Sequence, residues 1–277
     1  MTTAPVTAPA RPVVRQTVQL RTSLFWSLYG VWYRHLKVYC KTLLANATPP
    51  VLEPLFFFAA VVVGLAAYMK GGMFDGLDYP TYVASGMLVS SAMFTGVFET
   101  TYSTFVRLTW QRTYDAMVST HLRVPEVFVG ELLFCGTKGG AFAAVVLLVT
   151  LLFGVQVTWW CLLVPLIGFA TGYVFGTIGL IVTSYVKMMN NFTFFTTGII
   201  TPLFFFSGTF FPVRGVHGPW VDALWWILPL AHPIELSRAL FRAQAGWDTL
   251  LHVLIMIAYG VVCHWFAIRR MTKRVLG

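Results

Sequence analysis

Long apolar segments, rarely interrupted by charge, dominate the chain after residue 50. Each is about as long as the roughly 20 apolar residues that a helix needs to cross the hydrocarbon core of a bilayer. They lack strand-like alternation, and backbone groups in lipid must be satisfied within the segment, so we predict helices rather than a barrel. The six predicted spans cover residues 51–69, 82–106, 132–155, 160–186, 192–211 and 250–268.

A different pattern precedes the first span. Between residues 23 and 47, aromatic and aliphatic side chains recur at about 100° per residue, the spacing of one helix face. Trp32 belongs to this apolar face, whereas Arg34, Lys37 and Lys41 lie opposite it. The pattern predicts an amphipathic helix in the membrane interface, with its cations toward anionic lipid or water. Residues 1–22 are rich in Thr, Ala and Pro and predict a flexible cytoplasmic tail rather than a signal peptide.

The composition supports a membrane protein and orients it. Only 10% of the residues are charged, against roughly a quarter in ordinary soluble domains. The net charge of +9 is unevenly distributed, because fourteen of the 19 Lys and Arg fall on one side of the predicted spans and four on the other. The remaining one, Lys138, lies near the start of the third span and can extend toward the side with fourteen. The positive-inside rule places both termini in the cytoplasm, so the basic excess indicates topology rather than a nucleic-acid partner.

Two connections are too long for simple turns. In the cytoplasmic loop 107–131, Thr113 is placed to cap a short helix that extends through His121, and Pro125 is placed to begin the third span. The external loop 212–249 is rich in tryptophan and proline, which predicts re-entrant half-helices in the outer leaflet.

Small residues predict where helices pack. Gly168, Gly172 and Gly176 recur every four residues in the fourth span, and this spacing lets two helix backbones approach closely. We expect the stripe to seat a neighbouring helix of the same subunit rather than a subunit interface.

Polar residues inside apolar spans are the candidates for a substrate pathway. Glu53 and Glu99 are costly in hydrocarbon, so each either contacts a polar substrate, pairs inside the bundle or reaches interfacial water. The hydroxyls of the fifth span recur every four residues and share a face, which either lines a path at a dimer axis or bonds back to carbonyls of its own helix. The candidate pathway comprises Glu53, Glu99, Thr100, Ser103, Thr193, Thr197 and Thr201, with Phe204, Phe205 and Phe206 closing it near the outer leaflet.

Two stretches carry a resemblance to a known family. The sequence YDAMVSTHLRVP at residues 114–125, followed by Gly130 and Glu131, resembles the cytoplasmic loop of ABC-2 type transport permeases. The run TPLFFFSGTFFPV at 201–213, followed by LPLAHPIELSR at 228–238, resembles the C-terminal signature of that family. Within the family, the chain is most similar to the permeases of nodulation lipo-oligosaccharide exporters. The resemblance implies an all-α integral membrane protein with the ABC-2 (type V exporter-like) fold, in which the interfacial helix leads into a six-helix domain at residues 48–277.

The resemblance also implies partners. The chain would be a half-transporter of the bacterial cytoplasmic (inner) membrane, in which two copies join two copies of a separate ABC ATPase. It contains no G-x-x-x-x-G-K-[ST] stretch, so ATP and Mg are expected on that partner and no cofactor on this chain. In the family the loop helix seats in a cleft of the ATPase, and this role carries over to Arg112, Thr113, Tyr114, Asp115, Met117, His121 and Arg123.

Three classes of function follow. The favoured one is the permease of an ABC exporter that moves a lipid-linked oligosaccharide, polysaccharide or similar amphiphile. A proton-coupled carrier would use Glu53 or Glu99 as its titrating group, but the chain shows neither internal repeats nor a pair of broken helices. A membrane-embedded lipid-modifying enzyme would need a nucleophile with its base or a metal cluster, and the sequence shows no such set, so we predict no catalytic residues and no metal.

Overall fold

The computed structural model describes residues 23–43, 52, 56–61, 64, 72–214, 218–244 and 246–277. Within these ranges, four helices are long and apolar enough to cross a membrane, and they correspond to the second, third, fourth and sixth predicted spans. Most of the first predicted span, Glu53 and the tail 1–22 lie outside the described residues, so six spans remain a prediction. The four helices are Tyr79–Trp110, Val124–Leu152, Trp159–Tyr185 and Trp247–Leu276.

The predicted fifth span is a shorter helix, Asn191–Phe206. It consists of α7 (Asn191–Phe195), the π-helical turn η5 (Thr196–Ile200) and α8 (Thr201–Phe206). Pro202 cannot donate to the helix ladder, and a wider π turn before it accommodates the missing bond. The prediction of a helix to residue 211 is wrong, because the chain turns at Gly208, whose φ of 88° favours glycine. The sixteen residues span about 24 Å, less than a typical hydrocarbon core of about 30 Å.

The centre of the bundle is α3 (Tyr79–Phe98), which continues through the π-helical turns η2 (Glu99–Ser103) and η3 (Val106–Trp110). It packs against α5 (Val124–Leu152), α6 (Val164–Tyr185, preceded by the 3₁₀ turn η4, Trp159–Leu163) and α10 (Ala231–Arg242). Its buried hydroxyls bond to carbonyls of the preceding turn, as Ser90 does to Gly86 O at 2.8 Å and Thr95 to Ser91 O at 2.7 Å. These bonds satisfy polar groups that would otherwise be costly inside an apolar bundle.

Glycines bring α3, α5 and α6 into backbone contact. A Cβ atom added at Gly96 would lie 2.4 Å from the carbonyl oxygen of Gly172, and one added at Gly172 would lie 2.9 Å from that of Cys135. A Cβ atom added at Gly168 would lie 2.5 Å from the Cβ atom of Ala143 and 3.1 Å from the carbonyl oxygen of Gly139, both in α5. The glycine stripe therefore packs against helices of the same chain, as the sequence predicts.

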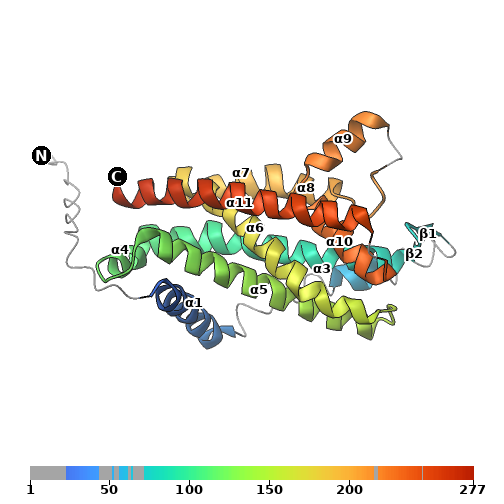
Figure 1. The fold of residues 1–277 in the computed structure, drawn as a ribbon, viewed down its shortest axis with the longest axis horizontal. Coiled ribbons are helices and arrows are strands. Elements are labelled where there is room, and N and C mark those ends of the chain that lie inside the picture. Colours follow the sequence, from blue (N-terminus) through green and yellow to red (C-terminus); the bar gives the residue numbers. More distant parts are fainter. Residues whose placement is uncertain are drawn as a thin grey trace, which may run out of the picture.

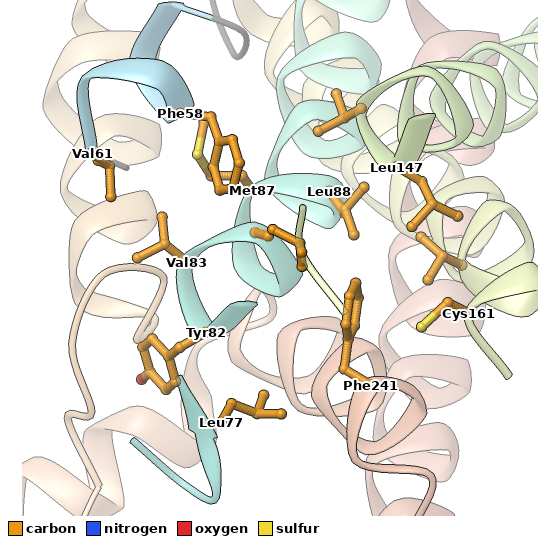
Figure 2. Close-up of a cluster of buried hydrophobic side chains, with 14 of the residues drawn as sticks. Phe58, Val61, Leu77, Tyr82, Val83, Met87, Leu88, Leu147, Cys161 and Phe241 are labelled. Atoms are coloured by element: carbon orange, nitrogen blue, oxygen red, sulfur yellow. The ribbon is translucent and has the colours of Figure 1, made fainter. Parts of the chain in front are cut away.

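The two ends of the bundle differ (Figure 1). At one end lie α4 (Thr113–Val118) and the C-terminal end of α11 (Trp247–Leu276). At the other end, the antiparallel strands β1 (Met73–Phe74) and β2 (Leu77–Asp78) form a hairpin beside α10. Its turn residues, Asp75 and Gly76, both have positive φ, as a two-residue hairpin turn requires. Figure 2 shows the apolar core at this end, where Leu88 of α3 lies near Leu147, and Tyr82, Cys161 and Phe241 belong to the same cluster.

The predicted external loop 212–249 contains two short helices, α9 (Pro219–Ile227) and α10. Most of α10 is buried, and it packs against α3 and α11. Residues of this loop therefore form part of the bundle.

Helix α1 (Leu24–Lys41) packs against α5. Its buried residues are Ser27, Val31 and His35. Part of the predicted apolar stripe contacts the bundle, as Trp32 does with Thr137 of α5, whereas Phe25 and Tyr29 of the same stripe are exposed. Small residues allow the close contact between α1 and α5. Val31 lies against Gly130 of α5, and a Cβ atom added at Gly130 would lie 2.7 Å from the Val31 side chain.

We expect Gly96→Ala to destabilise the bundle by about 1–3 kcal/mol, the usual cost of overpacking, because the added methyl meets backbone rather than a movable side chain. Gly260→Ala in α11 is the matched control, since its Cβ would meet only Val174 Cγ2 at 3.6 Å. Thermal unfolding of the purified variants in detergent measures the difference. Equal unfolding temperatures for the two variants would contradict the packing.

Candidate functional site

Four charged side chains meet inside the bundle at the α4 end. Glu99 pairs with Lys138, Nζ to Oε2 at 2.8 Å, and also with Arg107. Arg107 in turn reaches Glu131, Nη1 to Oε1 at 2.6 Å. The two glutamate side chains are 5% and 0% exposed. The cluster, which we call the charge network (Glu99, Arg107, Glu131 and Lys138), holds two negative and two positive groups.

Helix geometry places these groups together. Glu131 and Lys138 are seven residues apart on α5, two turns along one face. Glu99 and Arg107 are eight residues apart on the helix Tyr79–Trp110, which passes through two π-helical turns at this point. Such turns widen a helix and are frequent at functional sites. The two helices therefore present matched pairs, Glu99 to Lys138 and Arg107 to Glu131.

The charge network is joined to α4 by Tyr114. Its hydroxyl lies 2.7 Å from both carboxylate oxygens of Glu131, and Thr104 donates to the same carboxylate at 2.6 Å. Tyr114 is 1% exposed and packs on Phe128, with ring centroids 5.1 Å apart. Burial and the nearby Glu131 raise the pKa of Tyr114 well above its ordinary value, so the hydroxyl keeps the proton that it donates.

The predicted coupling residues divide between two faces of α4. Tyr114 and Met117 are buried against the bundle, whereas Asp115 faces solvent. The predicted extent of this helix is wrong: it ends at Val118, and His121 and Arg123 lie in the exposed segment before α5. Thr113 does not cap it, because its hydroxyl contacts Gln111 Oε1 at 3.4 Å.

Two further residues mark the borders of this loop. Arg112 precedes α4 in the left-handed conformation, with φ of 49°, which turns the chain sharply from the preceding helix. At the other border α5 begins at Val124 with Pro125 in its first turn, close to the predicted start, and Glu126 accepts from the Arg123 backbone N–H at 3.1 Å.

Helix α1 borders the charge network. Lys138 Nζ lies 4.7 Å from the ring centroid of Tyr39, and His35 stacks on Phe134 at 5.6 Å. Burial and the charge of Arg107 lower the pKa of His35 to about 3, so this imidazole is neutral at physiological pH. Trp32 donates from Nε1 to Thr137 at 3.0 Å. Of the predicted cationic face, Lys37 and Lys41 are exposed and Arg34 is half-buried.

The candidate pathway residues do not form one surface. Thr100 is buried and donates to Gly96 O at 2.9 Å, while Ser103 is half-buried. On the fifth helix, by contrast, Thr193 and Thr197 are exposed and Thr201 is partly exposed.

The three adjacent phenylalanines of the candidate pathway, Phe204, Phe205 and Phe206, also differ in burial. Phe204 packs on Phe94, with ring centroids 5.3 Å apart, whereas Phe205 and Phe206 are exposed. The fifth helix therefore carries an outer face of threonine and phenylalanine, and the hydroxyls of α3 lie inside the bundle.

A polar pocket of about 640 Å³ lies at the hairpin end. Arg238 lines this pocket and pairs with Glu235, Nη1 to Oε1 at 2.8 Å. Its guanidinium carbon lies 3.7 Å from the ring centroid of Tyr82. Glu235 and Arg238 are three residues apart on one face of α10, whereas His232 contacts His252, Nδ1 to Nδ1 at 2.9 Å. Among the described residues, no group of His, Cys, Asp and Glu could hold a metal ion.

Comparison with known proteins decides the family. The family model described as "ABC-2 type transporter" matches residues 27–242. The chain belongs to the ABC-2 type transporter family. This match includes the charge network, α4 and the lining of the polar pocket as far as Arg242.

Several relatives extend the match over most of this ABC-2 chain. Nodulation protein J of Rhizobium meliloti (strain 1021) is 31% identical, over 91% of this chain and 95% of that protein. Nodulation protein J of Rhizobium leguminosarum bv. trifolii is 32% identical, over 92% and 95%. The inner membrane transport permease YadH of Escherichia coli (strain K12) is 24% identical, over 89% and 96%. The family and the name of the Escherichia coli relative, a transport permease, fit the multi-pass membrane protein that the four candidate spans indicate.

We expect Tyr114→Phe to destabilise this ABC-2 bundle by about 1–3 kcal/mol, because it leaves a buried carboxylate short of a donor. Tyr102→Phe is the matched control, since among the described residues the Tyr102 ring has aromatic neighbours but its hydroxyl has no hydrogen-bond partner. The free energy of unfolding in detergent distinguishes the two. A loss no larger for Tyr114→Phe than for Tyr102→Phe would contradict the assigned bond.

Proposed function

We propose that this chain is the permease subunit of an exporter that moves a lipid-linked oligosaccharide, polysaccharide or similar amphiphile out of the cytoplasm. ABC-2 permeases generally work with an ABC ATPase, and here a separate ATPase subunit supplies the energy. The observation that carries the proposal is the Tyr114–Glu131 contact, which joins the loop helix to the membrane helices.

The division of α4 into two faces supports its role in coupling. The exposed face, with Asp115, is available to an ATPase, and the buried face transmits its movement. Tyr114 contacts Glu131 of α5, and through Arg107 the connection reaches Glu99. An ATPase that pulls α4 would therefore act on two spans at once.

The arrangement in the membrane rests on charge and on the ends of the bundle. The basic asymmetry favours a cytoplasmic location for both termini in the inner membrane, and α4 lies at the same end as the C-terminus (Figure 1). The hairpin, α10 and the polar pocket would then lie on the outer side.

Two copies of the chain would form the path. The outer face of the fifth helix combines hydroxyls, such as Thr193 and Thr197, with Phe205 and Phe206. Paired with the same face of a second copy, it would offer polar groups to a headgroup and aromatic rings to a lipid chain. The resulting complex has two permease and two ATPase subunits.

The proton-carrier alternative is less well supported. A carrier would use Glu99 as an exchangeable group, yet this carboxylate is already occupied by Arg107 and Lys138. Glu53, the other acidic candidate, lies outside the described residues.

The test separates binding of the ATPase to α4 from transmission of its movement to the membrane helices. Asp115→Arg on the exposed face of α4 should reduce copurification of an ABC ATPase that is coexpressed with this chain and copurifies with the wild type. Tyr114→Phe should retain copurification but lose stimulation of ATP hydrolysis by the permease. Gln244→Arg, exposed at the hairpin end, is the control and should change neither. Normal copurification and stimulation in all three variants would contradict the coupling role of α4.

A further inference from the structure

A groove of about 1030 Å³ follows the outer side of α11, where this helix meets α6 and the start of α5. Over most of its length the lining is apolar, with Ile257, Val261, Trp265 and Ile268. At one end the lining changes to Arg269 and Lys273, next to Pro125. The groove thus has the polarity of an amphiphile, with an apolar trough and a cationic end.

The two cations are directed toward the groove rather than the bundle. Arg269 and Lys273 are one turn apart, share a face and are both exposed. Within the described ranges, neither forms an ion pair with a carboxylate. Arg269 lies over the ring of Trp265, which itself lines the groove, at 5.1 Å from the ring centroid, whereas the guanidinium of Arg270 lies 4.7 Å from the ring centroid of Tyr185, outside the groove lining. The helix dipole favours cations at the C-terminal end of α11 in general. It does not explain why Arg269 and Lys273 line the groove and Arg270 does not.

The exposure and the length of α11 fit a helix that faces lipid across the hydrocarbon core. Among the candidate spans, α11 is the least enclosed: 17% of its apolar window is buried, against 89% for Tyr79–Trp110. From Trp247 to Ile268 the helix rises about 33 Å, close to the thickness of the hydrocarbon core. Arg269 and Lys273 then lie at headgroup level, and Trp265 occupies a position typical of interfacial tryptophan.

We propose that this groove binds an anionic phospholipid of the surrounding bilayer. An acyl chain occupies the trough along Ile257 and Val261, and the phosphate lies between Arg269 and Lys273. Basic pockets between membrane helices recognise anionic headgroups by this charge complementarity. The site is separate from the path proposed for the transported amphiphile, so it does not depend on what the chain exports.

The experiment uses the full chain reconstituted in vesicles of equal parts phosphatidylglycerol and phosphatidylcholine. After mild extraction, native mass spectrometry counts the lipids that each molecule retains. We expect wild type to retain phosphatidylglycerol in preference to phosphatidylcholine, and Arg269→Gln or Lys273→Gln to lower that retention about fivefold each. Arg270→Gln is the matched control on the same helix, and Arg269→Lys should restore retention.

A second variant tests the trough without changing charge. Gly260 lines the groove, and a Cβ atom added there would lie 3.6 Å from Val174 Cγ2, an ordinary van der Waals contact. Gly260→Leu should fill the trough and lower phosphatidylglycerol retention while the protein stays folded. The proposal is overturned if Arg269→Gln and Lys273→Gln retain as much phosphatidylglycerol as Arg270→Gln, or if both lipids are retained equally by wild type.

Discussion

Glu99 and Glu131 are buried between helices, where a carboxylate without a partner costs several kcal/mol. This constraint determines the α4 end of the protein. Lys138 and Arg107 supply the compensating charges, and Thr104 and Tyr114 supply further donors to Glu131. Removing any one of these charges or donors leaves a buried charged group without its partner in an apolar interior that cannot solvate it. The relative positions of two spans and the loop helix are therefore fixed together.

The same constraint explains how a six-residue helix could act on a membrane bundle. A helix as short as α4 has little stability of its own, so it depends on the contacts of Tyr114 and Met117 with the bundle. Displacing α4 would disturb the hydrogen bonds of a buried carboxylate, and the relaxation would involve both helices that hold the charge network. The close glycine contacts among α3, α5 and α6 favour movement of these helices as a unit, since backbones in direct contact have little room to slide.

Sequence reasoning recovered features that depend on local pattern. The apolar runs locate four spans, Pro125 marks the start of one, and the spacing of Gly168, Gly172 and Gly176 predicts their contact with neighbouring helices. The sequence leaves pairing of Glu99 inside the bundle open as one alternative, but it does not identify the partners. Lys138 was expected to extend toward the interface, and it pairs with Glu99, thirty-nine residues away. The seven-residue spacing of Glu131 and Lys138 was the available signal, but a single sequence does not show which helix faces them.

A double-mutant cycle on Tyr114→Phe and Glu99→Gln tests the central claim most directly, because these side chains are joined through Glu131 and Arg107. The quantity measured is the stimulation of the partner ATPase by the permease, expressed as a free energy for each single variant and the double variant. Independent sites would be additive within about 0.3–0.5 kcal/mol. If the charge network transmits movement from α4 to the spans, the cycle will show coupling of about 1 kcal/mol or more. Additive effects would contradict it.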